Sequence, residues 1–152
     1  MNKRAIADAI ATRYVGITAT VGGVTEGLVS APTARMPNTV QSTPVVLVYP
    51  PAGATEIGTS AIRQGEVVYL VRMLRDPTSV PERTDWLYAW DTAMTDRVEG
   101  DLDLGLPAYV AVAEVTGFRL AIDGQQYALE WFDVVEHEVT VSIYETGVPV
   151  GV

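Results

Sequence analysis

The chain has 152 residues, 48 % of them hydrophobic, and 19 acidic residues against 10 basic ones give a formal net charge of −9. This length has room for one domain with a buried core, and this apolar content excludes a wholly disordered chain. The acidic balance excludes a basic nucleic-acid binder and a protein held on an anionic membrane surface, but it is compatible with a channel through which nucleic acid slides.

Missing residue types and patterns narrow the class of protein further. The chain contains no cysteine, which excludes disulfides and thiolate metal sites. No apolar run approaches the roughly 20 residues that span a bilayer, so we expect a soluble, cytoplasmic protein.

The N-terminal part of the sequence predicts a helix followed by a hairpin. Residues 2–14 place Ile6, Ile10 and Tyr14 four positions apart, and this spacing predicts a short amphipathic helix. A helix of this length is marginal in isolation, so we expect it to pack on the rest of the chain. Residues 17–30 predict a small hairpin that turns at two adjacent glycines.

The middle of the sequence predicts two strands separated by a long loop. The polar, proline-containing residues 31–43 predict a loop, and the apolar run 45–49 predicts a strand covered on both faces. Residues 50–65 are rich in Gly, Ala, Ser and Thr, and predict a long loop of the kind that is usually functional or disordered. Residues 66–75 then predict a second strand.

A second helix is predicted after these strands. Ser79 and Glu82 match a capping box, in which the two side chains satisfy free backbone N–H groups of the first turn. Trp86, Trp90 and Met94 recur at intervals of four residues. This spacing predicts one apolar stripe, which should lie across a sheet.

The stretch 118–144 predicts a long antiparallel hairpin in the middle of that sheet. Asp123-Gly124 separates two extended runs and is a strong turn signal, because a type I′ turn requires positive φ at both central residues. Beyond it, residues at odd positions are mostly apolar and residues at even positions are mostly polar. The run exceeds an ordinary strand in length, so we expect a bend, bulge or break near Asp133.

Together with a strand over residues 109–115, these elements predict an α+β fold. We expect an antiparallel or mixed β-sheet with two α-helices packed on one face of it, in a single domain that spans residues 1–152.

Candidate reaction centres are weak. His137 lies between Glu136 and Glu138, which suggests a metal site, but on a strand its side chain points away from both glutamates, so a structural or surface role is favoured. Asp101 and Asp103 could bind a cation, although solvated carboxylates after a helix are commoner. We therefore predict no catalytic residues, no metal and no cofactor.

The tryptophans and arginines each allow a functional and a structural interpretation. Trp86, Trp90 and Trp131 could line a ligand pocket, but core packing is favoured. Arg63, Arg72 and Arg75, which bracket the second strand, could pair with acidic residues of another subunit, or be solvated or salt-bridged locally. The predicted subunit or partner interface comprises Ala54, Ile57, Ile62, Arg63, Arg72, Val148 and Val150.

The chain carries, in order, an N-terminal helix MNKRAIADAIATRY, a strand TPVVLVYPP, a strand EVVYLVRMLR, an aromatic-rich helix, the meander LPAYVAVAEVTGFRLAIDGQQYALEWFDVVEHEVTVSIY and a short tail. This order resembles that of the tail terminator proteins of long-tailed phages, also called minor tail or tail-to-head joining proteins. The resemblance implies a structural virion protein of the tail or neck, assembled in the host cytoplasm, rather than an enzyme.

The resemblance also implies partners. The protein would form a homo-oligomer, a hexameric ring, that caps the tail tube protein, stops its polymerisation and meets the neck or connector protein. DNA would pass through the lumen without sequence-specific binding, and no membrane is involved. Two alternatives stay open: a head-completion or neck adaptor protein on the portal side, and a small-ligand-binding domain or enzyme with a pocket between the second helix and the sheet.

Overall fold

The computed structural model describes residues 2–57, 62–77, 82–99, 104–106 and 110–146, and within these it describes only the backbone of residues 54–57, 62–64, 110 and 144–146. Its elements in chain order are α1 (Lys3–Arg13), β1 (Thr18–Val21), β2 (Val24–Gly27), β3 (Val45–Val48), β4 (Ala52–Ile57), β5 (Ile62–Arg75), α2 (Arg83–Glu99), β6 (Val110–Tyr127) and β7 (Glu130–Thr146). The fold is α+β, as the sequence predicts.

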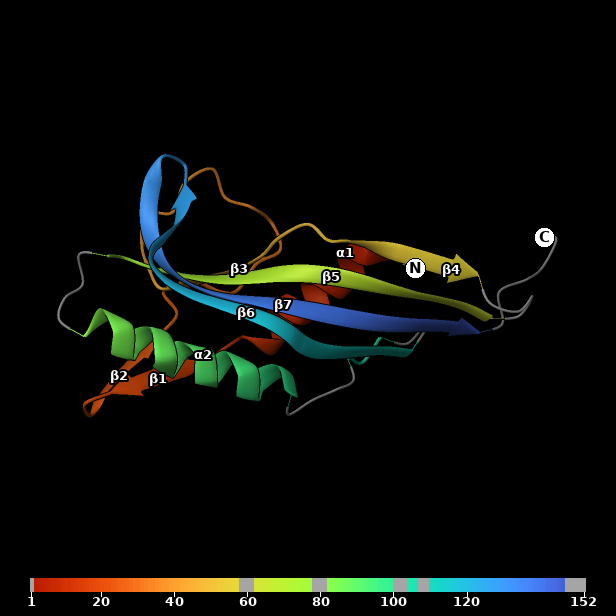
Figure 1. The fold of residues 1–152 in the computed structure, drawn as a ribbon, viewed down its shortest axis with the longest axis horizontal. Helices are drawn as coiled ribbons and strands as arrows, with labels where there is room; N and C mark the ends of the chain where they lie inside the picture. The colour runs from red at the N-terminus through yellow and green to blue at the C-terminus, as the bar shows by residue number, and fades with distance from the viewer. Residues whose placement is uncertain (1, 58–61, 78–81, 100–103, 107–109, 147–152) are drawn as a thin grey trace.

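The main sheet is antiparallel and has the order β3-β5-β7-β6, with β4 also paired to β5 (Figure 1). Strand β7 is central as expected, whereas β6 lies at an edge. Strands β3 and β4 lie one after the other along the edge of β5 that faces away from β7. Strands β1 and β2 form the predicted small hairpin, which is a separate two-stranded sheet.

Both helices contribute to one core on one face of the sheet. The predicted stripe of α2 is buried, including Trp86, Trp90 and Met94, and α1 buries Ile6 and Ile10 in the same cluster. The sheet supplies the odd-numbered positions of β5 and β7 to this core, namely Val67, Tyr69, Val71, Met73, Val135, Val139, Val141 and Ile143. The period-two pattern therefore identified the buried face of these strands correctly.

Asn2 caps the start of α1. The Asn2 side-chain oxygen accepts a hydrogen bond from the Ala5 backbone N–H at 3.0 Å. The predicted capping box of α2 is only half visible, because Ser79 lies outside the described residues. Glu82 precedes the helix with a φ of 73°, and its carbonyl accepts a hydrogen bond from the Trp86 N–H.

An ion pair with no sequence signal joins the β1–β2 hairpin to the core. Glu26 accepts hydrogen bonds from Arg75 at 3.1 Å and from the Trp90 indole at 2.9 Å. The Arg75 guanidinium also lies over the Trp86 ring, 4.9 Å from its centre. Arg75 is thus paired within the chain, as the local alternative supposed.

The prediction of a long loop over residues 50–65 is wrong. Strand β4 pairs with β5 over residues 52–57, and β5 begins at residue 62. Gly53 explains part of the weak sequence signal, because a Cβ there would lie 2.4 Å from the backbone oxygen of Glu66. The residue that interrupts the apolar pattern is the one that allows the two backbones to approach.

The predicted hairpin turn is also misplaced. The turn lies at Ala128-Leu129, with φ of 49° and 72°, and not at Asp123-Gly124. Asp123 does have the expected positive φ of 49°, but it adopts it inside an irregularity of β6. The local preference was real, and a bulge satisfied it in place of a turn.

Candidate assembly surface

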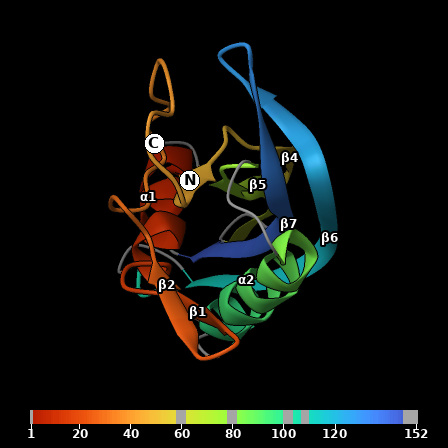
Figure 2. The same cartoon turned by 90° about the vertical axis from the view of Figure 1, so that its left-hand side faces the viewer.

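The β6–β7 hairpin continues past the end of its neighbour β5. Arg75, the last residue of β5, pairs with Asp133, so the strand residues from there to the turn pair only with each other. We call residues 122–132 the arm. Figure 1 shows the arm bending out of the plane of the sheet, and Figure 2 shows it projecting from the same end of the molecule as the loop 31–43.

The bend is produced by a bulge. Between the pairs Ala121↔Val134 and Gln125↔Phe132, strand β6 contains residues 122–124 whereas β7 contains only Asp133. Extra residues on one strand bend and twist an antiparallel ladder. The predicted bend or break near Asp133 is therefore confirmed.

Asp133 holds the bend through a buried ion pair with the first residue of α2. Its side chain is 0 % exposed and accepts hydrogen bonds from Arg83 at 2.9 and 2.6 Å. It also accepts the Asp123 backbone N–H at 2.8 Å. The hydrogen bond with Asp133 raises the pKa of the Arg83 guanidinium. Since a buried carboxylate without partners would be strongly disfavoured, this pair fixes the direction of the arm.

Two further contacts fix the arm from its sides. The Tyr127 hydroxyl donates a hydrogen bond to the carbonyl of Pro37 in the loop 31–43. Burial, and the nearby Tyr49, raise the pKa of the Tyr127 phenol. From the sheet, Arg119 donates to the carbonyl of Gly124 at 2.9 Å. The arm is therefore tied both to the loop and to the body.

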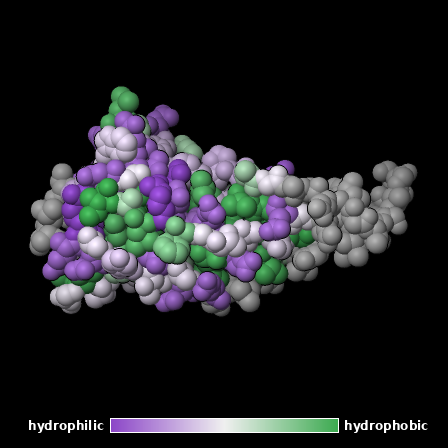
Figure 3. Space-filling model, viewed as in Figure 1, coloured by the Kyte–Doolittle hydropathy of each residue, from purple (hydrophilic) through white to green (hydrophobic). Residues whose placement is uncertain are grey.

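The arm and its base expose apolar side chains. Leu129 is 89 % exposed, Trp131 is 53 % exposed, and Ile122 on the arm and Phe118 at its base are exposed too. Figure 3 shows hydrophobic atoms at the top of the projecting hairpin. The prediction that Trp131 packs in the core is wrong, because it lies beyond the bend, where no helix covers the strands.

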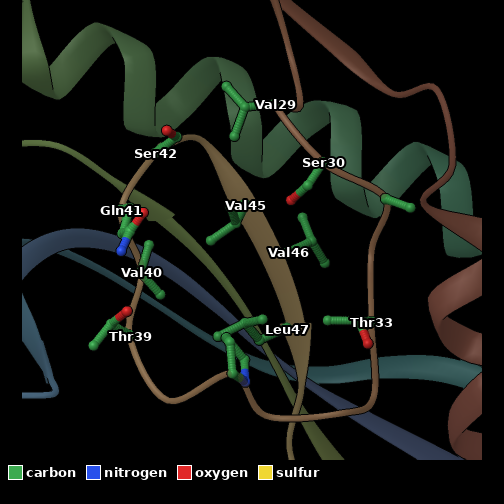
Figure 4. Close-up of a pocket in the computed structure, with 12 residues that line it drawn as sticks. Val29, Ser30, Thr33, Thr39, Val40, Gln41, Ser42, Val45, Val46 and Leu47 are labelled. Atoms are coloured by element: carbon green, nitrogen blue, oxygen red, sulfur yellow. The ribbon is translucent and has the colours of Figure 1, made fainter.

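A cavity of about 500 Å³ lies beside the arm, between β3 and the segment that precedes it (Figure 4). Val40, Val45 and Leu47 give it an apolar floor, and belong to a second small core on the sheet face opposite the helices. The rest of its lining is partly polar, with serine, threonine and glutamine side chains, and partly apolar, with Val29, Ala31, Pro37 and Val46, and it contains no charged residue. Pro37 lines the cavity and also accepts the arm's tyrosine hydrogen bond, so the two features adjoin.

The interface residues predicted from the sequence fall in three places. Ala54 and Ile57 lie on β4, and Ile62 and Arg63 on β5 beside them, where Ile57 pairs with Arg63; their side chains are not among those described. These four come together at the end of the sheet away from the arm. Val148 and Val150 lie outside the described residues.

Arg72 is placed in the middle of the sheet and is paired within the chain. It donates to Glu136 at 2.7 Å and lies 4.3 Å from the centre of the Tyr49 ring. Burial opposes ionisation of Glu136, but hydrogen bonds from Arg72 and Arg119 outweigh it and lower the pKa of this carboxyl. Arg72 is therefore salt-bridged locally, and its assignment to a subunit interface stays a prediction.

The structural interpretation of His137 agrees with its surroundings. The ring is 0 % exposed on the helix-covered face, and its Nε2 lies 2.6 Å from Asp91 Oδ1 of α2. Glu136 and Glu138 lie on the opposite face, where Glu138 is exposed. Among the residues that the structure describes, no three His, Cys, Asp or Glu side chains are grouped to hold a metal ion. Asp101 and Asp103 lie outside that part of the chain.

The comparisons with known proteins leave the family open. No protein-family model matches the sequence, and no curated protein matches it. Within the described ranges, no helix has the length and hydropathy needed to cross a membrane.

Sequence reasoning missed the arm as a surface. The residues Leu129-Glu130-Trp131 were assigned to the alternating strand, because the turn was placed before them. The usable signal was the length of the strands. β6 has 18 residues and β7 has 17, whereas β5, with which β7 pairs, has only 14. A hairpin longer than the strand it pairs with must project beyond it.

Proposed function

We propose that this chain is a structural virion protein of a long-tailed phage, which forms a ring at the head-proximal end of the tail tube, ends tube polymerisation and joins the tail to the head. The observation that carries the proposal is the arm. Its apolar side chains are held away from the core by a buried ion pair and a bulge, and are thus kept available for another molecule. Exposed apolar groups of this kind mark protein–protein contacts.

The ion pairs of the described body hold its elements in place. Its buried or half-buried ion pairs join elements of the chain to one another: Arg83 with Asp133, and Arg75 with Glu26. Each acts as a structural tie. The resemblance to tail terminator proteins, which rests on the order of elements in the sequence, is the reason to prefer a terminator, and the α+β fold is compatible with it.

The geometry also suits a ring. A closed ring requires two different complementary surfaces on each subunit. The sheet has two edges, formed by β6 on one side and by β3 with β4 on the other, and the arm adds a third surface. In a hexamer, the excess of 19 acidic over 10 basic residues would repel DNA phosphates from the lumen and let DNA slide without being bound.

Tube capping tests the proposal. The purified chain is mixed with tail tube protein from the same genome, and tube lengths are measured by negative-stain electron microscopy. We expect short tubes with a ring at one end, and long uncapped tubes when the chain is left out. Tubes of unchanged length without a terminal ring would contradict the proposal.

The first alternative is a head-completion or neck adaptor protein on the portal side. The same preparation separates the two functions when it is offered portal rings and tubes in turn. A terminator binds tube ends, whereas an adaptor binds portal rings and leaves tube growth unaffected.

The second alternative, a small-ligand-binding domain or enzyme, is favoured by the cavity, whose volume of about 500 Å³ suits a small molecule. It lies against β3 and not between α2 and the sheet, where the sequence placed it. Mass photometry separates the functions: a strict monomer that never joins tubes favours a ligand protein, and a ring favours the virion protein.

A further inference from the structure

The arm and the cavity are two surfaces of the same chain that do not meet within one copy. Leu129 at the tip is 89 % exposed, so its side chain does not fill the cavity beside it. The hydrogen bond from Tyr127 to Pro37 ties the arm to the cavity wall, two residues before this tip. One copy therefore has an apolar projection and an apolar hollow, and neither is filled by the other.

The tip itself departs from ordinary turn chemistry. Ala128 and Leu129 have φ of 49° and 72°, a turn for which Asn-Gly is the usual sequence. A non-glycine residue held at positive φ is strained, and here Leu129 also exposes an apolar side chain. A local rule broken without a gain in stability is typical of a functional position.

The arm and the loop beside the cavity carry opposite charges. Glu130 stands between Leu129 and Trp131 and is exposed. Arg35 is exposed on the loop between Thr33 and Pro37, which both line the cavity. Neither side chain forms an ion pair with another described residue. On strand β7 the acidic side chain thus points to the face of the arm opposite to Trp131, and the basic residue lies on the loop whose Thr33 and Pro37 line the uncharged hollow.

We propose that the arm of one copy docks in the cavity of a second copy, with Leu129 and Trp131 in the hollow and Glu130, on the other face of the arm, beside the neighbour's Arg35. The contact joins two different surfaces, so its repetition runs head to tail and closes into a ring when the rotation allows. It deepens the proposed function, on which it rests for the expectation that copies assemble, by naming the contact between subunits.

Charge reversal and mixing test the contact on the full chain. Glu130→Arg and Arg35→Glu each place like charges together, and we expect each variant alone to self-associate at least about tenfold more weakly than the native protein in sedimentation velocity. An equimolar mixture of the two variants restores opposite charges at every contact of an alternating assembly. We expect the mixture to regain native association, which an effect within one copy could not produce.

The control is Glu99→Arg, the same change at an exposed position of α2, outside the arm and the sheet edges. It should leave association unchanged, and circular dichroism should show that all variants are folded. Association that neither reversal weakens, a mixture that stays dissociated, or a native protein that is monomeric at every concentration would each overturn the contact.

The outcome is separable from that of the proposed function. Copies that associate through the arm but never cap tubes would retain the contact and remove the terminator function. Tubes capped equally by the native chain and by both reversal variants would retain the function and remove the contact. If the arm binds tube protein while the copies stay monomeric, the arm is a surface for another partner, and the proposed contact between copies is overturned.

Discussion

Trp90 and Trp131 show how differently the helix-covered body and the arm use the same side chain. Trp90 is 0 % exposed in the core between α2 and the sheet, and its indole N–H donates to Glu26. Trp131 lies on β7, a central strand of the same sheet, yet is 53 % exposed. The body uses apolar area for its own stability, whereas the arm leaves apolar area free and depends on polar contacts for its shape.

The largest expected effect separates the two tryptophans. Trp90→Ala should lower the free energy of unfolding by about 3–5 kcal/mol, because it opens a cavity in the core and removes a hydrogen bond. Trp131→Ala should change it by less than about 1 kcal/mol, because the side chain is already half in water. Urea denaturation at equilibrium measures both. Similar losses for the two variants would show that the arm is part of the core.

The next effect concerns the buried carboxylate at the bend. Asp133→Asn should cost about 2–3 kcal/mol, because the hydrogen bonds from Arg83 lose their charged acceptor and the new amide NH2 faces a donor of Arg83 or Asp123 in a buried site. Asp123→Asn is the matched control: its carboxyl also contacts Arg83 but is 55 % exposed, so the expected loss is about 0–1 kcal/mol. Hydrogen exchange of residues 122–132 should accelerate only in the first variant. Unchanged exchange there would mean that the bend does not depend on this pair.

Two glycines, one in the body and one in the arm, lie where an added Cβ would clash with a neighbouring residue. Gly53→Ala would place a Cβ 2.4 Å from the Glu66 oxygen, so β4 must shift, at a cost of about 1–3 kcal/mol in global stability. Gly124→Ala would place one 2.3 Å from the Ala121 Cβ, and should speed amide exchange of the arm while changing global stability less. Equal global losses would indicate that the arm and the body unfold as one unit.

The smallest effect is expected at the junction, where Arg119 bonds both Glu136 of the body and Gly124 of the arm. Because the pKa of Glu136 is lowered in the folded state, its stabilisation is present above the ordinary value of 4.5 and is lost as the pH falls through the lower folded pKa. Glu136→Gln should cost about 1 kcal/mol at pH 7 and less near pH 3. Denaturation at both pH values checks this, and a difference independent of pH would remove the ionic explanation.

Periodicity in the sequence determined both helices, the buried face of β5 and β7, and the burial of β3, because helix and strand spacing alone decide which side chains share a face. Even the bend near Asp133 was foreseeable, since no sheet of this size accommodates so long a straight strand. These features depend on residues that are close together in the sequence, so they can be predicted from the sequence alone.

Only the tertiary structure decided the position of the turn, the pairing of β4 and the projection of the arm. Asp123-Gly124 prefers positive φ in a turn or a bulge alike, and the choice was made by Asp133 and by Arg83, 50 positions before it. Gly53 lowers the local preference for a strand, yet it allows the backbone of β4 to approach that of β5. The local sequence determines which backbone angles have low energy, whereas contacts between distant residues select the structure in which those angles are adopted.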